Sequence, residues 1–351
     1  MSSRVLAVVG GQYGSEGKGN IVAKIASNYD MHIRTGGPNA GHSLRHKGRT
    51  WKMRMVPCGW VNPDAKLFIG PGAVVDPRLL RREIDEVAEV DPTIHSRIRI
   101  AASAAVTLPE DEEAEAGLVF SIGSTGEGVG EARARRMARK DTGRVLLRDV
   151  ADEEGLSRYV IEDTTSYTSN HIRAGKSILL EGTQGFGLSL IHGHWPYVTS
   201  HDTTAATLTA DAGLSPLDVT NVLLVVRTMP IRVAGTSGPL ENETDWDTVG
   251  KRLGKDVTER TTVTQKIRRI ADWDDGLVKR AINVNRPTSI ALNFLDYLDP
   301  DIEGEHMWNV IAKSDRVLGM VSYVESRFGV PVSIVGTGGP EWSISYRRPA
   351  L

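Results

Sequence analysis

The sequence has little cysteine, no excess of charge of either sign and no long apolar run. Its one cysteine, Cys58, excludes an internal disulfide and a cysteine-rich metal site. With 42 basic and 44 acidic residues, the chain lacks a broad basic field for nucleic acid or an anionic membrane surface. The apolar start, residues 1–11, is too short for a membrane helix and lacks a signal-peptide cleavage pattern. We therefore expect a cytoplasmic protein that binds neither nucleic acid nor membrane.

Continuous apolar runs recur along the chain and predict strands that are buried on both faces of a parallel sheet. They lie at residues 5–9, 66–70, 177–182, 222–228, 289–295 and 332–338. Helical patterns fall between them, at 76–90, 131–140 and 314–328, and Asp76 and Pro77 suit the N-cap and first position of the first. The alternation predicts an α/β fold with a large, mostly parallel central sheet and helical and loop insertions. We expect one domain over residues 1–351, with its sites at the carboxyl ends of strands.

The segment VLAVVGGQYGSEGKGNIVAKIA, residues 5–26, runs from a predicted strand through five glycines into a predicted helix. Gly17 and Lys18 match the end of a Walker A loop, but Gly19 replaces the hydroxyl residue that binds Mg²⁺ there. Glycine lets backbone amides approach a phosphate, while Lys18 and the helix N-terminus add positive charge. A ligand-free glycine turn is the alternative. Strand, loop, Gly-Lys and helix together favour a P-loop-related phosphate site, with Ser15 at its tip.

Further polar and glycine-rich segments follow this loop along the chain. The segment RTGGPNAGHS, residues 34–43, indicates a second backbone cradle with His42 at its rim. A lone histidine is often structural, but beside a phosphate loop His42 becomes a candidate general acid. The segment 123–140 leads a Ser/Thr/Gly loop into an arginine-rich helix, which is either a solvated face or a phosphate clamp. His192 and His194 lack a carboxylate at a familiar zinc spacing, so we do not expect zinc.

Six spaced motifs resemble those of the adenylosuccinate synthetases, in order and over nearly the whole chain. They are GGQYGSEGKG, GGPNAGHS, STGEGVG, EGTQGFGLSL, WPYVTS and TGGP. The resemblance implies a ligase with Mg²⁺ as cofactor and a two-step reaction. The γ-phosphoryl group of a nucleoside triphosphate is transferred to O6 of a 6-oxopurine nucleotide, and the amino group of L-aspartate then displaces that phosphate at C6.

The resemblance also implies roles for individual residues. It places the catalytic groups at Ser15, Lys18 and His42. It places the purine nucleotide at Ser15, Asn39, Thr125, Arg139, Gln184, Thr199 and Val233. It places the triphosphate at Gly14, Glu16, Gly17, Lys18, Gly19, Gly41, His42, Ser43, Arg268, Phe294, Asp296, Thr337 and Gly339. It places L-aspartate at Thr262, Val263, Thr264, Gln265, Lys266 and Arg268, and Mg²⁺ at Ser15 and Gly41. Arg139 matches an arginine that reaches the neighbouring subunit's nucleotide, which implies a homodimer.

The chain departs from the family pattern at Ser15, where the family has an aspartate. That aspartate takes the proton from N1 of inosinate and helps to hold the metal, whereas a serine hydroxyl is a poor base without charge. Guanine carries a 2-amino group beside N1, and serine both leaves room for it and accepts a hydrogen bond from it. Serine at this position is the mark of a viral branch of the family, which the chain resembles and whose members use dGMP, L-aspartate and ATP. We therefore predict a dGMP ligase that makes N6-succino-2-amino-2′-deoxyadenylate, in the host cytoplasm if the protein is viral.

Other readings of the same residues stay open. One is an ordinary synthetase that uses IMP, L-aspartate and GTP, and another is a switch that only hydrolyses a triphosphate. Phe294 replaces the lysine of guanine-using bacterial enzymes, which fits ATP, whereas Asp296 would recognise guanine. Gln265 and Lys266 stand where relatives often have glycine and arginine. Lysine keeps the positive charge for the aspartate substrate, but it cannot bind a carboxylate through two parallel hydrogen bonds as arginine does. A Rossmann dehydrogenase is disfavoured because no G-x-G-x-x-G follows the first strand.

Overall fold

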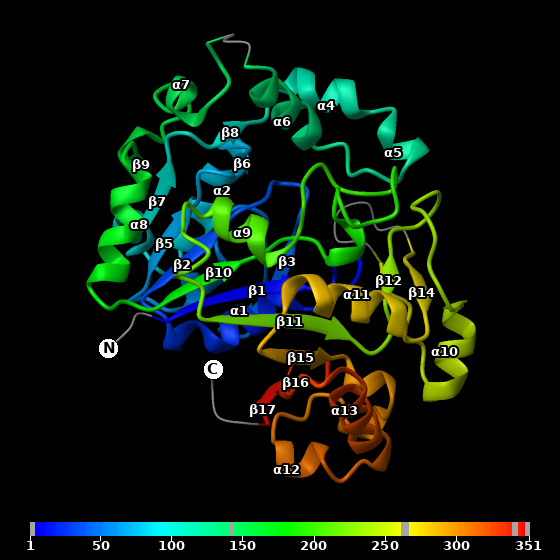
Figure 1. The fold of residues 1–351 in the computed structure, drawn as a ribbon. Coiled ribbons are helices and arrows are strands. Elements are labelled where there is room, and N and C mark those ends of the chain that lie inside the picture. The colour runs from blue at the N-terminus through cyan, green and yellow to red at the C-terminus, as the bar shows by residue number, and fades with distance from the viewer. Residues whose placement is uncertain (1–3, 140–142, 261–266, 339–342, 348–351) are drawn as a thin grey trace.

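A ten-stranded sheet forms the centre of the protein (Figure 1). The computed structural model describes residues 4–139, 143–260, 267–338 and 343–347. The strand order is β17 (Ile344–Tyr346), β16 (Val332–Gly336), β15 (Ser289–Asn293), β11 (Asn221–Arg227), β1 (Val5–Gly10), β10 (Ile178–Glu181), β2 (Met31–Arg34), β5 (Lys66–Ile69), β7 (Ile98–Ala101) and β9 (Val160–Ile161). All neighbours are parallel except β16 and β17, which are antiparallel. The predicted α/β fold with its mostly parallel sheet is confirmed.

All six predicted strands belong to this sheet, as β1, β5, β10, β11, β15 and β16. Sequence patterns missed β2, β7, β9 and β17, which have two to four residues each. β9 and β17, with two and three residues, give too few positions for an apolar run to stand out, and the charged Arg99 interrupts β7. In β2, moreover, the polar His32 and Arg34 are fully or almost fully buried, because both have hydrogen-bond partners inside the fold.

The three predicted helices are present as α2 (Pro77–Ala88), α6 (Val129–Ala138) and α13 (Asp315–Phe328). The Asp76 carboxylate caps α2, accepting hydrogen bonds from the amides of Arg78 and Leu79, both at 3.0 Å. The other α-helices in the described part of the chain are α1 (Lys18–Ile25), α3 (Ile94–Arg97), α4 (Pro109–Glu115), α5 (Leu118–Ser121), α7 (Leu147–Val150), α8 (Thr164–Arg173), α9 (Ala205–Asp211), α10 (Trp246–Leu253), α11 (Asp275–Asn285) and α12 (Trp308–Ile311).

Two insertions lie away from the central sheet in Figure 1. The helices α4, α5 and α6 gather at the top of the view, and the strands β12 (Ile231–Arg232), β13 (Glu243–Thr244) and β14 (Arg269–Ala271) form a small sheet beside α10 at the right. The remaining short strands are β3 (His42–His46), β4 (Arg49–Met53), β6 (Val74–Val75) and β8 (Ala105–Val106).

The acidic run at residues 110–117 lies mostly in α4 and is only partly exposed to solvent. Two of its carboxylates, those of Asp111 and Glu115, are buried. Asp111 forms an ion pair with Arg135, and Glu115 accepts hydrogen bonds from the amides of Gly128 (2.9 Å) and Gly130 (2.5 Å). The Glu115 carboxylate stabilises the start of α6, where its negative charge meets the positive end of the helix, whereas Asp111 pairs with the last turn of that helix.

Buried apolar side chains form a large cluster that runs in sequence from Val5 to Ile344. Its extent supports our proposal that the chain folds as one domain. In the part of the chain that the structure describes, no helix combines the length and apolarity needed to cross a bilayer.

Candidate active site

Several of the predicted site residues follow the carboxyl ends of adjacent parallel strands. From one side of the sheet to the other, these strands are β16, β15, β11, β1, β10 and β2. Thr337 follows β16, Phe294 and Asp296 follow β15, and Gln184 follows β10. The glycine loop leaves β1 at the middle of this row and enters α1 at Lys18. The sheet therefore collects segments that lie far apart in the sequence at one edge, as expected for an α/β fold.

The glycine loop is built around the buried carboxylate of Glu16. Its Oε1 accepts hydrogen bonds from the amides of Gln12 (3.1 Å) and Gly14 (2.9 Å), and its Oε2 forms a 2.6 Å ion pair with Lys18. The loop enters α1 through Gly17, whose φ of 89° favours glycine. Because the Glu16 side chain is bonded inside the loop, its backbone is the part available to a triphosphate.

Lys18 is buried and bonded on two sides. Besides Glu16, its ammonium group donates a hydrogen bond to the backbone carbonyl of Gln184, which follows β10. This contact ties the glycine loop to the turn after β10. The Lys18 ammonium group therefore links two of the sequence motifs, the glycine loop GGQYGSEGKG and the segment EGTQGFGLSL.

Ser15 lies at the exposed tip of the loop with a φ of 58°, in the left-handed region. Its hydroxyl accepts a hydrogen bond from the guanidinium of Arg268. Its carbonyl oxygen accepts one from Arg227, with the two atoms 3.2 Å apart. Ser15 is thus held between two arginines, one of which, Arg268, is also a predicted site residue.

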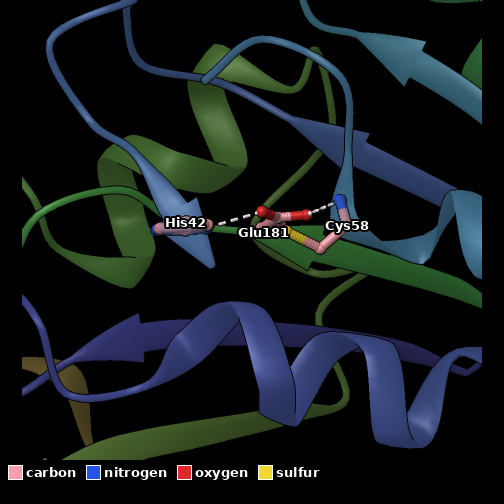
Figure 2. Close-up of side chains that lie close together, drawn as sticks. All are labelled: His42, Cys58 and Glu181. Atoms are coloured by element: carbon pink, nitrogen blue, oxygen red, sulfur yellow. Dashed lines mark hydrogen bonds and ion pairs between the residues drawn. The ribbon is translucent and has the colours of Figure 1, made fainter. Parts of the chain in front are cut away.

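His42 begins β3 and lies against Glu181, the last residue of β10 (Figure 2). Its Nδ1 is 2.6 Å from Oε1 of Glu181, and the Arg34 guanidinium lies at the same distance from that oxygen. Burial lowers the pKa of His42 to about 4, Arg34 acts in the same direction, and Glu181 opposes them. Although burial alone raises the pKa of Glu181, Arg34 and His42 hold it at about 2.

His42, Glu181 and Cys58 also bring three potential metal ligands together, with ligand atoms within 4.8 Å of one another. Figure 2 shows the three side chains converging. However, the Arg34 guanidinium lies 2.6 Å from the Glu181 carboxylate and 3.9 Å from the Cys58 sulfur. Burial also raises the pKa of the Cys58 thiol, which favours its neutral form. A fixed cation and a neutral thiol make this a hydrogen-bonded network and not a metal centre.

Several residues assigned to the purine nucleotide lie beside β10 and the segment after β2. The Asn39 amide donates to the Thr199 hydroxyl at 3.4 Å. Within the described residues, Asn39 Oδ1, Thr183 Oγ1 and Gln184 Oε1 are buried without a hydrogen-bond partner. Buried polar atoms are rarely left unpaired, so these three are suited to a polar ligand. Thr183 was not among the predicted residues.

Three other residues assigned to the purine nucleotide lie in the insertions, away from the central sheet. Thr125 is exposed before α6, Arg139 is exposed at the end of α6 with a φ of 55°, and Val233 is half-buried just after β12.

A pocket of about 680 Å³ lies on the β15 side of the glycine loop. It is lined by Lys255, Asp256, Val257, Thr258, Glu259, Arg260, Ile267, Phe294, Asp296, Tyr297, Glu303 and Gly338. Asp296 is 3% exposed, and its Oδ1 has no hydrogen-bond partner among the described residues. Burial raises the pKa of Asp296 to about 7, and Glu303 adds to this rise. Phe294 and Asp296 thus line one pocket, while the Thr337 hydroxyl donates a hydrogen bond to the Glu305 carbonyl.

Sequence reasoning missed the group that links this pocket to the glycine loop. Arg227, at the end of β11, is fully buried, and its guanidinium carbon lies 3.8 Å from the centre of the Phe294 ring. It forms an ion pair with Glu259, which also accepts a 2.7 Å hydrogen bond from the Tyr297 hydroxyl. A charged residue that ends an apolar strand was the available signal, and the same signal marks Arg34 and Glu181.

Some predicted residues lie outside the described part of the chain. These are Thr262, Val263, Thr264, Gln265 and Lys266, assigned to L-aspartate, and Gly339, assigned to the triphosphate. The neighbouring Arg268 and Glu259 are described, and the Arg268 amide donates to the Glu259 carbonyl at 2.9 Å.

The fold and the glycine loop define an enzyme of nucleotide chemistry. The chain matches the sequence model of the adenylosuccinate synthetases in two segments, residues 7–160 and 146–303. It is 36% identical over 337 residues to the adenylosuccinate synthetase of Archaeoglobus fulgidus, covering 94% of each chain, and 37% identical over 342 residues to that of Methanococcus vannielii, covering 96% of each. The protein belongs to the adenylosuccinate synthetase family, whose members are ligases that form a C–N bond.

Two solved structures share the fold. One is the succinoaminodeoxyadenylate synthetase of cyanophage S-2L bound to dGMP and dATP, with a TM-score of 0.83, 29% identity, and coverage of 99% of this chain and 96% of that one. The other is the fully ligated adenylosuccinate synthetase of Plasmodium falciparum, with a TM-score of 0.86, 18% identity, and coverage of 99% and 100%. The second likeness concerns the fold alone.

Proposed function

We propose that the protein condenses dGMP with L-aspartate, using ATP, to form N6-succino-2-amino-2′-deoxyadenylate, ADP and phosphate. The observation that carries the proposal is Ser15 at the tip of the glycine loop, where the family has a carboxylate. The phage enzyme that shares this fold is bound to dGMP and to dATP as an energy donor, which supports the proposal. The archaeal relatives, at similar or higher identity, are adenylosuccinate synthetases, so IMP with GTP is the second candidate.

The proposed first step needs charge neutralisation and positioning more than covalent chemistry. Lys18 and the amides of the glycine loop would bind the triphosphate, and His42 would contact the purine O6 as it attacks the γ-phosphorus. The bond between that phosphorus and the β-phosphate oxygen breaks, which releases ADP. In the second step the aspartate amino group attacks C6, and phosphate leaves with O6. The Arg268 guanidinium lies beside Ser15, where it can bind either the aspartate substrate or the triphosphate.

Adenylosuccinate synthetases use Mg²⁺, and the two candidate ligands fit it unequally. Gly41 is exposed and offers a backbone carbonyl, an oxygen ligand of the kind that Mg²⁺ prefers. The Ser15 hydroxyl is uncharged and accepts a hydrogen bond from the cationic Arg268, so it fits less well. We propose Gly41 as the protein ligand, with substrate oxygens completing the shell. When bound, the ion supplies charge neutralisation at the phosphates.

We also propose a homodimer in which Arg139 contacts the acceptor nucleotide of the other subunit. Its exposure at the end of α6 supports this role. The mass in solution tests the proposal by light scattering after gel filtration. A protein that remains monomeric in the presence of both nucleotides would rule it out.

A mass-spectrometric assay of the products tests the choice of acceptor. Equal amounts of dGMP, GMP and IMP are offered in parallel with ATP, L-aspartate and Mg²⁺. We expect the succinylated product from dGMP and none from IMP. Product from IMP alone would establish the second candidate, and ADP release without any succinylated product would identify a triphosphatase.

A substitution of Asp296 by asparagine should alter the choice of donor. An ionised carboxylate accepts two hydrogen bonds from guanine N1–H and N2–H, whereas a protonated one matches the donor and acceptor of adenine. With its pKa raised to about 7, wild-type Asp296 should favour ATP below that pH and accept GTP more readily above it. In Asp296→Asn the side-chain amide presents one hydrogen-bond donor and one acceptor at either pH, as the protonated carboxyl group does. We expect its KM for GTP to rise about 10-fold or more while that for ATP stays within about 2-fold.

The KM values for both donors at pH 6 and pH 8 provide the measurement. The matched variant is Asp256→Asn, since Asp256 lines the same pocket but is exposed. A donor preference in Asp296→Asn that still changes with pH as in the wild type would contradict this role for Asp296.

A further inference from the structure

Arg227 contacts three separate segments of the chain with one guanidinium group. It lies at the end of β11 and is fully buried. Its Nη1 donates a 3.2 Å hydrogen bond to the Ser15 carbonyl at the tip of the glycine loop. The guanidinium also pairs with the Glu259 carboxylate, and its central carbon lies 3.8 Å from the centre of the Phe294 ring. Although burial alone lowers the pKa of Arg227, Glu259 raises it above its usual value, so the group stays charged.

The backbone of Arg227 is held as firmly as its side chain. Its amide donates a hydrogen bond to Oε1 of Gln12 (2.9 Å), and Nε2 of Gln12 donates one to its carbonyl (3.0 Å). In the sheet, Arg227 pairs with Asn293 of β15, the residue that precedes Phe294. The guanidinium therefore extends from a fixed point beside the segment that carries Phe294.

Phe294 has a backbone conformation that a phenylalanine rarely adopts. Its φ is 61°, in the left-handed region. A residue keeps such a conformation only where several contacts hold it, and these residues are common at ligand sites. Here the Thr228 hydroxyl donates a 2.6 Å hydrogen bond to the Phe294 carbonyl, and the Tyr297 ring packs edge-on with the ring centres 5.7 Å apart. Arg227 is the contact that lies against the Phe294 ring itself.

Phe294 forms part of the wall of the pocket that we assign to the donor base. Arg227 is not among the described residues that line this pocket, so it can act on a ligand there only through neighbours such as Phe294 and Glu259. An aromatic ring can stack on a purine, and such stacking tolerates any base. A buried guanidinium is attracted to the face of an aromatic ring, which restrains the orientation of that ring.

We propose that Arg227 is a positioning residue for the donor nucleotide, which holds the Phe294 ring in the orientation that receives the purine base. Arg227 then determines how tightly the donor base is bound, whereas Asp296 determines which base is preferred. This inference rests on the proposed function, because it takes the pocket as the site of the donor base. It is independent of whether the acceptor is dGMP or IMP.

Three substitutions test this role. Arg227→Lys keeps the charge beside Glu259 but removes the flat guanidinium that lies against the ring. Phe294→Leu removes the ring and keeps an apolar side chain. Arg97→Lys is the matched control, since Arg97 is also nearly buried, pairs with Asp91 and donates to backbone carbonyls, but lies at the end of α3 and does not line the pocket.

The experiment measures dissociation constants by calorimetry on the full-length protein with Mg²⁺. The ligands are the non-hydrolysable imido analogues of ATP and GTP, and inorganic tripolyphosphate, which has the phosphates without the base. We expect Arg227→Lys to weaken both analogues about 10-fold, with their ratio and the affinity for tripolyphosphate within about 2-fold of wild type. Phe294→Leu should also cost about 10-fold, and the double variant about 10-fold rather than about 100-fold, because both changes remove one contact. Arg97→Lys should bind as the wild type does.

Four results would overturn the proposal. They are unchanged analogue affinities in Arg227→Lys, multiplied losses in the double variant, an equal loss for tripolyphosphate, and a wild type that binds neither analogue. An equal loss for tripolyphosphate would place the role of Arg227 at Ser15 and the glycine loop. Thermal melting shows whether each variant is folded. If Arg227→Lys does not fold, Arg227→Gln combined with Glu259→Gln removes the same guanidinium without leaving a charge unpaired, and the same ligands are measured.

The proposed function and the role of Arg227 fail separately. A wild type that binds the analogues in this way but forms no succinylated product would contradict only the proposed function. Analogue affinities that Arg227→Lys leaves unchanged, in a protein that does form the product, would contradict only the role of Arg227.

Discussion

Replacing Ser15 by aspartate should abolish the use of dGMP and create the use of IMP. The new carboxylate supplies the base that the serine lacks, and a positioned base contributes about 10²–10⁴-fold to a rate. It also fills the space that we assign to the 2-amino group of guanine. Because Arg268 already donates to the Ser15 hydroxyl, it would hold the new carboxylate ionised at neutral pH. We expect dGMP turnover to fall about 100-fold or more, measured by the succinylated product.

Ser15→Ala is the control for this change. It keeps the space and removes only one hydroxyl, so dGMP turnover should stay within about 10-fold of wild type. IMP should remain unused, because alanine supplies no base. If Ser15→Asp folds with an unchanged melting temperature and still prefers dGMP, position 15 does not determine the acceptor.

The second large effect is expected at Lys18. Replacing it by methionine removes the cation of the glycine loop, and the loss of one such charge at a phosphoryl group costs about 10²–10³-fold in rate. The change also leaves Glu16 as an unpaired buried carboxylate. Breaking a buried ion pair in this way destabilises a protein by about 3–5 kcal/mol, so part of the loss would reflect unfolding.

A double variant separates these two effects. In Glu16→Gln/Lys18→Met the glutamine oxygen still accepts from the amides of Gln12 and Gly14, while no charge is left unpaired. The melting temperature should recover most of its loss, whereas the rate of ADP release should remain low. Recovery of the rate as well would mean that Lys18 acts only by stabilising the loop.

The fold could be predicted from sequence because its central strands are long and apolar enough to stand out. The runs at β1, β10, β11 and β15 carry no charge before their last residue, as strands covered on both faces require. The edge strands β9 and β17, with two and three residues, and β7, which Arg99 interrupts, could not be found in the same way. Their positions depend on pairing with residues far along the chain.

The candidate site was only partly predictable, for a related reason. Glycines, Lys18 and His42 are recognisable because their residue types and spacing are unusual in a strand or helix. Arg34, Glu181 and Arg227 each end an apolar strand, and nothing local shows which partner they bind. Their contacts join strands that are neighbours only in the sheet, such as β2 with β10. A single sequence shows that such a charged residue is unusual at the end of an apolar strand, but it does not show which residue it contacts.

The end of β10 and the turn after it hold two of the candidate catalytic residues, His42 and Lys18. Glu181 bonds His42, and three residues later the Gln184 carbonyl bonds Lys18. β10 itself is clamped between β1 and β2 in the middle of the sheet. A small shift of this strand would therefore carry the histidine and the lysine together and preserve their separation. Substitutions that disturb the packing of β10 should therefore impair His42 and Lys18 together. The kinetic defects of different variants along β10 should resemble one another more than they resemble those of a variant of His42 or Lys18 alone.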